Sequence, residues 1–195
     1  QHLKNSLYEP SARVPMIIAG PDVDKGGVVD DLVSLIDVYP TLMDMAGIAH
    51  PEALEGCSLM PELAGESASD RADWVFSEYH SNFQNTSSFM LRDGDWKYIV
   101  YDGYEPQLFN LAADPYEVDN LTDADPDVRE RMDAQMREIV DYHAVAEKVR
   151  AYNKASFREW RANTDPKEYE EAMSTYFEDW GPELKARIEK WLEES

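Results

Sequence analysis

Apolar residues in the middle of this chain fall into short runs separated by turn residues. Runs rich in Val, Ile, Tyr, Phe and Trp are typical of β-strands when turn signals bound them. The Asp93-Gly94-Asp95 turn between two such runs is a strong hairpin signal. We therefore predict an antiparallel meander of four strands, at residues 74–79, 89–92, 96–101 and 107–111.

Two patterns before this sheet are less regular. Residues 14–19 form an apolar run of strand length that Gly20-Pro21 closes, and they predict a buried strand. Residues 28–33 predict a further short element. Residues 48–73 are rich in Pro, Gly, Ser and charge, which predicts a long loop with one helical turn.

A helix is predicted over residues 34–46, where apolar residues recur at helical spacing. Ser34 stands three residues before Asp37, the arrangement of a capping box. Pro40 is tolerated only in or near the first turn, so the helix is expected to begin slightly later than Ser34. Gly47 fits a C-terminal cap.

Helical stripes dominate the C-terminal third. Residues 125–140 predict an amphipathic helix whose apolar stripe is Val128, Met132, Met136, Ile139 and Val140. Further helices are predicted at residues 142–160, 167–180 and 182–194. Asp165 or Thr164 is expected to cap the second of these.

The composition is that of a globular and strongly acidic chain. Hydrophobic residues make up 43% of 195 residues, and no run reaches the ~20 apolar residues that a membrane helix needs. The 40 acidic and 18 basic residues give a formal charge of −22. Such a surface repels nucleic-acid phosphates and anionic lipids, so neither nucleic acid nor a membrane is expected as a partner. The acidic excess is typical of halophilic proteins, with ordinary acidic solubility as the alternative.

Three side chains are candidates for chemistry. Lys4 lies in a polar loop shortly before the run of residues 14–19, from where it could reach a site at a sheet edge; taken alone it is typical of a solvated lysine. His80 opens a polar loop, where binding residues are common, and a loop histidine without a role is the alternative. Arg92 could bind an anion, but ion pairs with nearby carboxylates explain it as well.

Three motifs, in this order, carry a family resemblance. They are Lys-x-Ser-x-Tyr-Glu-x-x-x-Arg-Val-Pro at residues 4–15, the helix of residues 34–47, and Leu-Phe-Asn-Leu-x-x-Asp-Pro-x-Glu-x-x-Asn-Leu at residues 108–121. Together they resemble type I sulfatases of the alkaline-phosphatase-like superfamily, among them arylsulfatases and choline-sulfatase-like enzymes. The third motif is the most specific, and its role is expected to be structural, with a turn at Asp114-Pro115.

The resemblance implies an α/β fold, α+β within this chain. Residues 1–73 would be the C-terminal end of a large α/β domain. Residues 74–141 would be a small C-terminal subdomain, a four-stranded antiparallel sheet packed with a helix. Residues 142–195 would be a helical tail.

The resemblance also implies the chemistry of the site. The family lysine that matches Lys4 contacts the sulfate group, so Lys4 is the expected catalytic residue and His80 a candidate for substrate binding. The family uses a formylglycine nucleophile and a calcium ion held by Asp and Asn oxygens. The Cys-x-Pro-x-Arg motif does not occur here, so formylglycine and the calcium ligands are expected outside this chain, and no metal ligand is predicted in it. Cys57, the only cysteine, falls where the family has a surface turn and is expected to be structural or incidental.

The function that follows is the C-terminal part of a sulfatase acting on a small-molecule or carbohydrate sulfate ester, inactive on its own. The alternatives are a related phosphonate or phosphate ester hydrolase and a non-catalytic interaction or assembly module. The aromatic face of the tail would support a homo-oligomer, with packing inside the monomer as the alternative; it comprises Tyr169, Met173, Tyr176, Phe177 and Trp180. Cytoplasmic, secreted and periplasmic locations all stay open.

Overall fold

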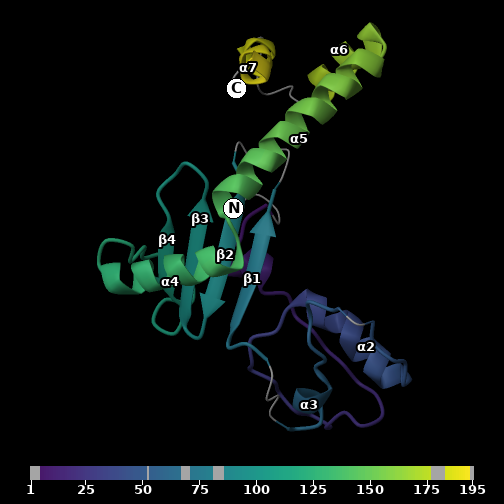
Figure 1. Ribbon diagram of the computed structural model, residues 1–195, viewed down its shortest axis with the longest axis vertical. Helices are drawn as coiled ribbons and strands as arrows, with labels where there is room; N and C mark the ends of the chain where they lie inside the picture. The colour runs from purple at the N-terminus through teal and green to yellow at the C-terminus, as the bar shows by residue number, and fades with distance from the viewer. Residues whose placement is uncertain (1–4, 52, 67–70, 81–85, 177–182, 194–195) are drawn as a thin grey trace. The chain divides into compact units, whose positions relative to one another are not determined.

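The computed structural model describes residues 5–51, 53–66, 71–80, 86–176 and 183–193. The chain divides into two compact units, residues 1–142 and 143–195. Figure 1 shows strands and helices in the first unit, and helices in the second. Among the described residues, no helix combines the length and apolarity needed to span a bilayer.

The first unit is built on a four-stranded antiparallel sheet in the order β1-β2-β3-β4. Its register pairs Ser77 with Met90 and Met90 with Ile99, so these side chains share one face. The predicted meander is confirmed, and its strands are β1 (Trp74–Tyr79), β2 (Ser88–Asp93), β3 (Trp96–Tyr101) and β4 (Gln107–Asn110).

Helix α4 (Pro126–Ile139) covers one face of this sheet (Figure 1). Met132 and Met136, from the predicted apolar stripe, are fully buried. The hydroxyl of Tyr98 on β3 donates to Asp133 Oδ1 of the helix at 3.2 Å. The predicted amphipathic helix is therefore confirmed, with the expected face inward.

The opposite face of the sheet is covered by residues 5–12, which we call the N-terminal segment; its last turn is the short helix α1 (Glu9–Ala12). Leu7 of this segment is buried in one apolar cluster with Met90, Ile99, Phe109 and Leu111. The ring of Tyr8 packs edge-on against Phe109, with centroids 6.0 Å apart. The sheet thus lies between a C-terminal helix and a segment from the start of the chain.

The strand predicted at residues 14–19 is wrong for this chain. These residues form no strand, and Ile17 is 94% exposed. A strand must pair its backbone N–H and C=O groups with a neighbour, and no described strand pairs with this run. The element expected at residues 28–33 is likewise neither helix nor strand, and Val28 is 82% exposed.

The predicted helix of residues 34–46 is confirmed, with a late start. A 3-10 turn (Leu35–Asp37) leads into α2 (Val38–Ala46), which places Pro40 in the first helical turn. Gly47 ends the helix with a left-handed φ of 66°. The expected helical turn in the following loop is α3 (Met60–Leu63).

A buried ionic cluster holds this loop against the helix. The guanidinium of Arg71 donates to Asp37 Oδ2 at 2.8 Å and to Glu62 Oε1 at 2.6 Å. Asp37 also accepts from the backbone N–H groups of Ser34 at 2.8 Å and Cys57 at 2.9 Å. Asp37 thus forms the predicted capping box with Ser34 and also pairs with Arg71. Cys57 is an exposed free thiol.

The second unit contains most of α5 (Tyr142–Asn163), together with α6 (Pro166–Tyr176) and α7 (Glu183–Glu193). Asp165 caps α6, since its Oδ1 accepts the N–H of Lys167 at 2.8 Å. Tyr169 is 7% exposed, and its ring packs against Trp160 at a tilted angle with centroids 5.4 Å apart, which supports packing within the monomer at this residue. Phe177 and Trp180, also predicted for this aromatic face, lie outside the described residues.

Candidate functional site

Two tyrosine hydroxyls form hydrogen bonds between the N-terminal segment and the sheet. The hydroxyl of Tyr79, the last residue of β1, donates to Asn5 Oδ1 at 2.8 Å. The hydroxyl of Tyr8 donates to Gln107 Oε1 of β4 at 2.7 Å. Lys4, the predicted catalytic residue, directly precedes Asn5 in the sequence and lies outside the described residues.

The most buried charge of this face is Lys97 on β3, whose side chain has no solvent exposure. Its Nζ donates to Glu9 Oε1 at 2.9 Å and lies 2.8 Å from Glu117 Oε1. Glu117 Oε2 in turn accepts the backbone N–H of Glu9 at 2.6 Å. Arg92 Nη1 lies 3.6 Å from Glu9 Oε2, so this arginine pairs with a carboxylate, the alternative that the sequence left open.

We call these four residues, Glu9, Arg92, Lys97 and Glu117, the Lys97 cluster. A buried ion pair is tolerated only when both charges are paired and hydrogen-bonded. Two cations and two carboxylates meet here, so the formal charges balance. The cluster therefore joins the N-terminal segment, through Glu9, to β2, to β3 and to the loop after β4. The charges of Lys97 and Glu117 are buried, and those of Glu9 and Arg92 are partly exposed.

The loop that carries Glu117 is shaped by Asp114. The Asp114 carboxylate accepts the backbone N–H groups of Val118 at 2.7 Å, Asp119 at 2.9 Å and Tyr116 at 3.3 Å. These hydrogen bonds, the one from Asp119 foremost, lower the pKa of Asp114. Glu117 adopts a left-handed φ of 56° inside this turn. Asp114 thus has the structural role that the sequence predicted, and the turn that it stabilises presents Glu117 to Lys97.

His80 packs on the other side of the sheet. Its ring lies edge-on to Phe89, with centroids 5.3 Å apart, and its side chain is 19% exposed. Its Nε2 is 3.5 Å from Glu78 Oε2. Phe89 points to the α4 face, whereas Tyr79 reaches Asn5 on the opposite face. A substrate-binding role for His80 stays a prediction.

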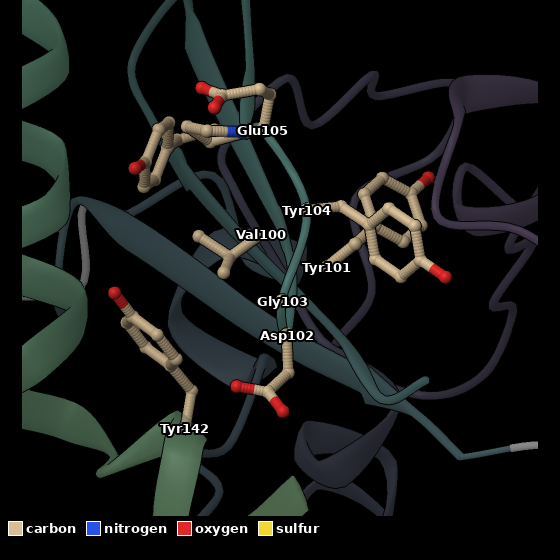
Figure 2. A pocket seen from close by; sticks show the side chains of 9 residues that line it. Val100, Tyr101, Asp102, Gly103, Tyr104, Glu105 and Tyr142 are labelled. Atoms are coloured by element: carbon tan, nitrogen blue, oxygen red, sulfur yellow. The ribbon is translucent and has the colours of Figure 1, made fainter. Parts of the chain in front are cut away.

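A pocket of about 510 Å³ surrounds the turn between β3 and β4 (Figure 2). Figure 2 shows Val100 and Tyr142 on one side of this turn, and Tyr101 and Tyr104 on the other. Burial, followed by the charge of a nearby aspartate, raises the pKa of Tyr98 in its lining. Asp102 and Glu105 also line it. Their carboxylates oppose an anionic sulfate ester, so this pocket is a poor candidate for the sulfate site.

No group of three or more His, Cys, Asp or Glu side chains in the described part of the chain is arranged to hold a metal ion. The acidic residues of the Lys97 cluster are already neutralised by lysine and arginine. A calcium ion would have to displace those cations to bind there. These residues therefore do not fit a calcium site.

Comparison with known proteins identifies the family. The family model described as N-sulphoglucosamine sulphohydrolase, C-terminal, matches residues 2–144. The chain belongs to this family, and it is the C-terminal portion of a sulfatase of the alkaline-phosphatase-like superfamily.

The curated relatives include Arylsulfatase K of Danio rerio, which is 40% identical over 203 residues. The alignment covers 98% of this chain and 39% of that protein. Arylsulfatase K of Homo sapiens is 36% identical, with 98% of this chain and 38% of that protein covered. The chain thus spans about two fifths of the length of these relatives.

Solved structures agree with the fold class. A sulfatase from Bacteroides thetaiotaomicron matches with a TM-score of 0.61 and 32% identity over 86% of this chain and 35% of that one. A structure described as a 2-O GAG sulfatase matches with a TM-score of 0.54 and 32% identity over 76% and 32%. A phosphonate monoester hydrolase from Silicibacter pomeroyi matches with a TM-score of 0.55 and 25% identity over 64% and 29%. The mixed α/β fold class is therefore confirmed.

Lys97 and its pairing with Glu117 were not predicted from the sequence. One signal was present, because Lys97 interrupts a strand that is apolar on both faces, Trp96 to Tyr101. A lysine at such a position must be paired, since an isolated buried charge is costly. Its partners, 88 and 20 residues away in the sequence, were not visible without the fold.

Replacing Lys97 by methionine tests how much this cluster stabilises the fold. Lys97→Met keeps the length of the side chain but leaves the carboxylates of Glu9 and Glu117 facing a buried apolar group. We expect the free energy of unfolding of the chain to fall by about 3–5 kcal/mol, as when one partner of a buried ion pair is removed. Urea denaturation followed by circular dichroism measures it.

The matched control is Lys148→Met, the same substitution at an exposed position of α5. It should change the free energy of unfolding by no more than about 0.5 kcal/mol. Equal changes in the free energy of unfolding for the two substitutions would contradict a stabilising role of Lys97.

Proposed function

We propose that the intact protein is a sulfuric ester hydrolase, to which this chain contributes Lys4 and the sheet that supports it. The observation that carries the proposal is the similarity to arylsulfatases over 98% of the chain. The Lys-x-Ser-x-Tyr-Glu pattern at residues 4–9 supports it, since Lys4 matches the family lysine that contacts sulfate.

Hydrolysis of a sulfate monoester breaks the bond between sulfur and the alcohol oxygen and delivers the sulfuryl group to water. Negative charge builds up on the leaving oxygen as this bond lengthens, so a fixed cation lowers the barrier. The Lys4 ammonium would supply that cation at a sulfate oxygen. Calcium and formylglycine, which the family resemblance implies, would supply a Lewis acid and a nucleophile from the part of the protein outside this chain.

We infer a sulfated carbohydrate as the substrate class. The support is the match to a protein described as a 2-O GAG sulfatase, at 32% identity over 76% of this chain. His80 remains the proposed contact to the alcohol part of the substrate. The opening of its loop at the end of β1 supports this, and the packing of its ring on Phe89 leaves 19% of the side chain exposed.

A phosphonate or phosphate ester hydrolase is the second candidate. The match to a phosphonate monoester hydrolase favours it, at 25% identity and a TM-score of 0.55. Both reactions place a cation beside a tetrahedral anionic centre, so the residues of this chain suit either. The identity to sulfatases is higher, 32% over 86% of this chain, and this favours sulfate.

Turnover by the intact protein tests this proposal. We expect hydrolysis of an aryl sulfate at a kcat/KM above that for the matching aryl phosphonate monoester. Lys4→Ala should lower kcat for the sulfate by a factor of ~100, as loss of one charge-stabilising donor does. Lys25→Ala, at an exposed loop lysine of the same chain, is the matched control and should leave kcat unchanged.

A higher kcat/KM for the phosphonate would replace the sulfatase proposal by the second candidate. An unchanged kcat in Lys4→Ala would remove Lys4 from the site.

We propose further that residues 1–73 complete a large α/β domain, followed by the subdomain of residues 74–141 and the tail of residues 142–195. Exposed apolar side chains support the first boundary, because soluble proteins seldom expose many large apolar groups together. They gather before residue 73: Ile17 94%, Val28 82%, Leu35 66%, Leu42 58% and Ile48 57% exposed. The part of the protein outside this chain would cover them.

An aspartate at Ile17 tests this boundary. In the isolated chain Ile17→Asp should change the free energy of unfolding by no more than about 0.5 kcal/mol, because the side chain already faces water. In the intact protein it should lower the melting temperature by several degrees, since a carboxylate would be buried without a partner. Val118→Asp, at a side chain that is 76% exposed in the turn after β4, is the control and should be neutral in both proteins. An intact protein that tolerates Ile17→Asp equally well would contradict the proposed covering.

A further inference from the structure

The pocket at the turn between β3 and β4 has side chains from the α4 face of the sheet in its lining. Side chains of a strand alternate between its two faces, so Tyr98, Val100 and Asp102 share one face. It is the face that α4 covers, because the hydroxyl of Tyr98 donates to Asp133 of that helix at 3.2 Å. Tyr142, the first residue of α5, lies on the same side of the turn as Val100 (Figure 2).

The rings of Tyr98 and Tyr142 are held in place by fixed partners. Both hydroxyls donate to Asp133 Oδ1, at 3.2 Å from Tyr98 and 3.1 Å from Tyr142. The ring of Tyr142 also packs against the fully buried Phe89, with centroids 5.9 Å apart. The faces of such rings carry partial negative charge. The pocket therefore presents two negative ring faces that do not have to be ordered when a ligand binds.

Two carboxylates add full negative charge to the same lining. Glu105 lies on the exposed turn, whereas Asp102 is only 8% exposed. Burial raises the pKa of the Tyr142 hydroxyl, and the charges of Asp133 and then Asp102 raise it further. The guanidinium of Arg137 acts in the opposite direction. This effect needs only the charge of Asp102, whatever its oxygens bind, and water screens a buried charge less than an exposed one.

One ring of this pocket already holds a cation. The guanidinium carbon of Arg137 lies 4.5 Å from the ring centroid of Tyr142, which is a cation–π contact. Arg137 also donates from Nε to Asp133 Oδ2 at 2.7 Å, so the charges of this pair compensate each other. No lysine or arginine of the described chain is in the pocket lining, which leaves the charges of Asp102 and Glu105 uncompensated there by a basic lining residue.

We propose that this pocket binds a small organic ammonium ion. Its volume of about 510 Å³ lies in the range of small-molecule sites. Ring faces and carboxylates both attract positive charge, and the apolar groups of an alkylammonium ion match the rings and Val100. The inference requires neither Lys4 nor any step of ester hydrolysis.

Other classes of ligand fit this lining less well. An anion is repelled by Asp102 and Glu105, and a neutral molecule gains only the apolar contact with the rings. A calcium or magnesium ion needs several oxygen ligands at once. No group of three or more acidic, histidine or cysteine side chains in the described ranges is arranged for that.

Calorimetric titration of the intact protein with tetramethylammonium chloride tests the proposal. The neutral probe is 2-methyl-2-propanol, which is similar in size and carries no charge, and sodium chloride keeps the ionic strength constant. We expect a Kd for tetramethylammonium at least ~10-fold lower than for the alcohol, since only the cation gains from the ring faces and the carboxylates. Equal Kd values, or no binding of tetramethylammonium, would overturn the proposal.

Variants separate this pocket from the acidic surface as a whole. Tyr142→Leu removes a ring and should raise the Kd for tetramethylammonium about 10-fold, whereas Tyr142→Phe keeps the ring and should change it less than threefold. Glu105→Gln removes one charge at an exposed position and should raise the Kd about threefold. The matched control is Tyr116→Leu, at a ring that is 85% exposed and outside the pocket lining, and it should leave the Kd unchanged.

Melting temperatures show whether each variant is folded. Tetramethylammonium binding that Tyr142→Leu and Glu105→Gln both leave unchanged would show attraction to the acidic surface in general, and it would overturn the proposal. Glu105→Gln keeps the test decisive even if Tyr142→Leu does not fold, because Glu105 is exposed and packs in no core.

Discussion

Two ion pairs of Lys97, in the middle of the sheet, hold this structure together. One is with Glu9 in the N-terminal segment, and the other is with Glu117 after the last strand. A lysine with no solvent exposure can stay charged only if carboxylates replace its water. The fold must therefore bring both glutamates to the same face of β3. This requirement joins three segments that are far apart in the sequence.

The same requirement explains the two unlike faces of the sheet. The face toward α4 is closed by buried methionines, a hydrogen bond from Tyr98 to Asp133 and an ion pair between Arg131 and Asp93, and no charge is buried at its centre as Lys97 is on the other face. The opposite face is closed by an eight-residue segment too short to bury much apolar area, with Leu7 as its buried anchor. Charge pairing with Lys97 supplies the specificity that this short segment lacks. The candidate catalytic residue Lys4 directly precedes this segment in the sequence.

The sequence predicted those elements whose reasons are local. The Asp93-Gly94 turn, the runs of β-forming residues in the strands and the methionine stripe of α4 each follow from neighbouring residues, and the structure has them where expected. The strand predicted at residues 14–19 was wrong because no described strand offers backbone groups for this run to pair with. A high strand propensity alone therefore did not produce a strand there, and Ile17 is exposed. The aromatic face of α6 was only partly testable, since Phe177 and Trp180 lie outside the described residues.

The candidate site was predictable only in part, for a related reason. Lys4 and Glu9 came from a motif, whereas the contacts of Tyr79 with Asn5 and of Lys97 with Glu9 join residues 74 and 88 positions apart. Contacts between residues so far apart depend on how the sheet packs, and no periodic pattern in the sequence indicates them. Arg92 illustrates the point, because its neighbours in the chain suggested an ion pair, but only the fold identified Glu9 as the partner.

The most direct measurement is the hydrogen exchange of the Glu9 amide, followed by NMR in the chain of residues 1–195. This amide donates to Glu117 Oε2 at 2.6 Å, beside the buried Lys97. The account predicts that it exchanges as slowly as the amides in the centre of β3, because both open only when the sheet opens. Exchange as fast as that of the exposed Ile17 would contradict the claim that the Lys97 cluster locks the start of the chain onto the sheet.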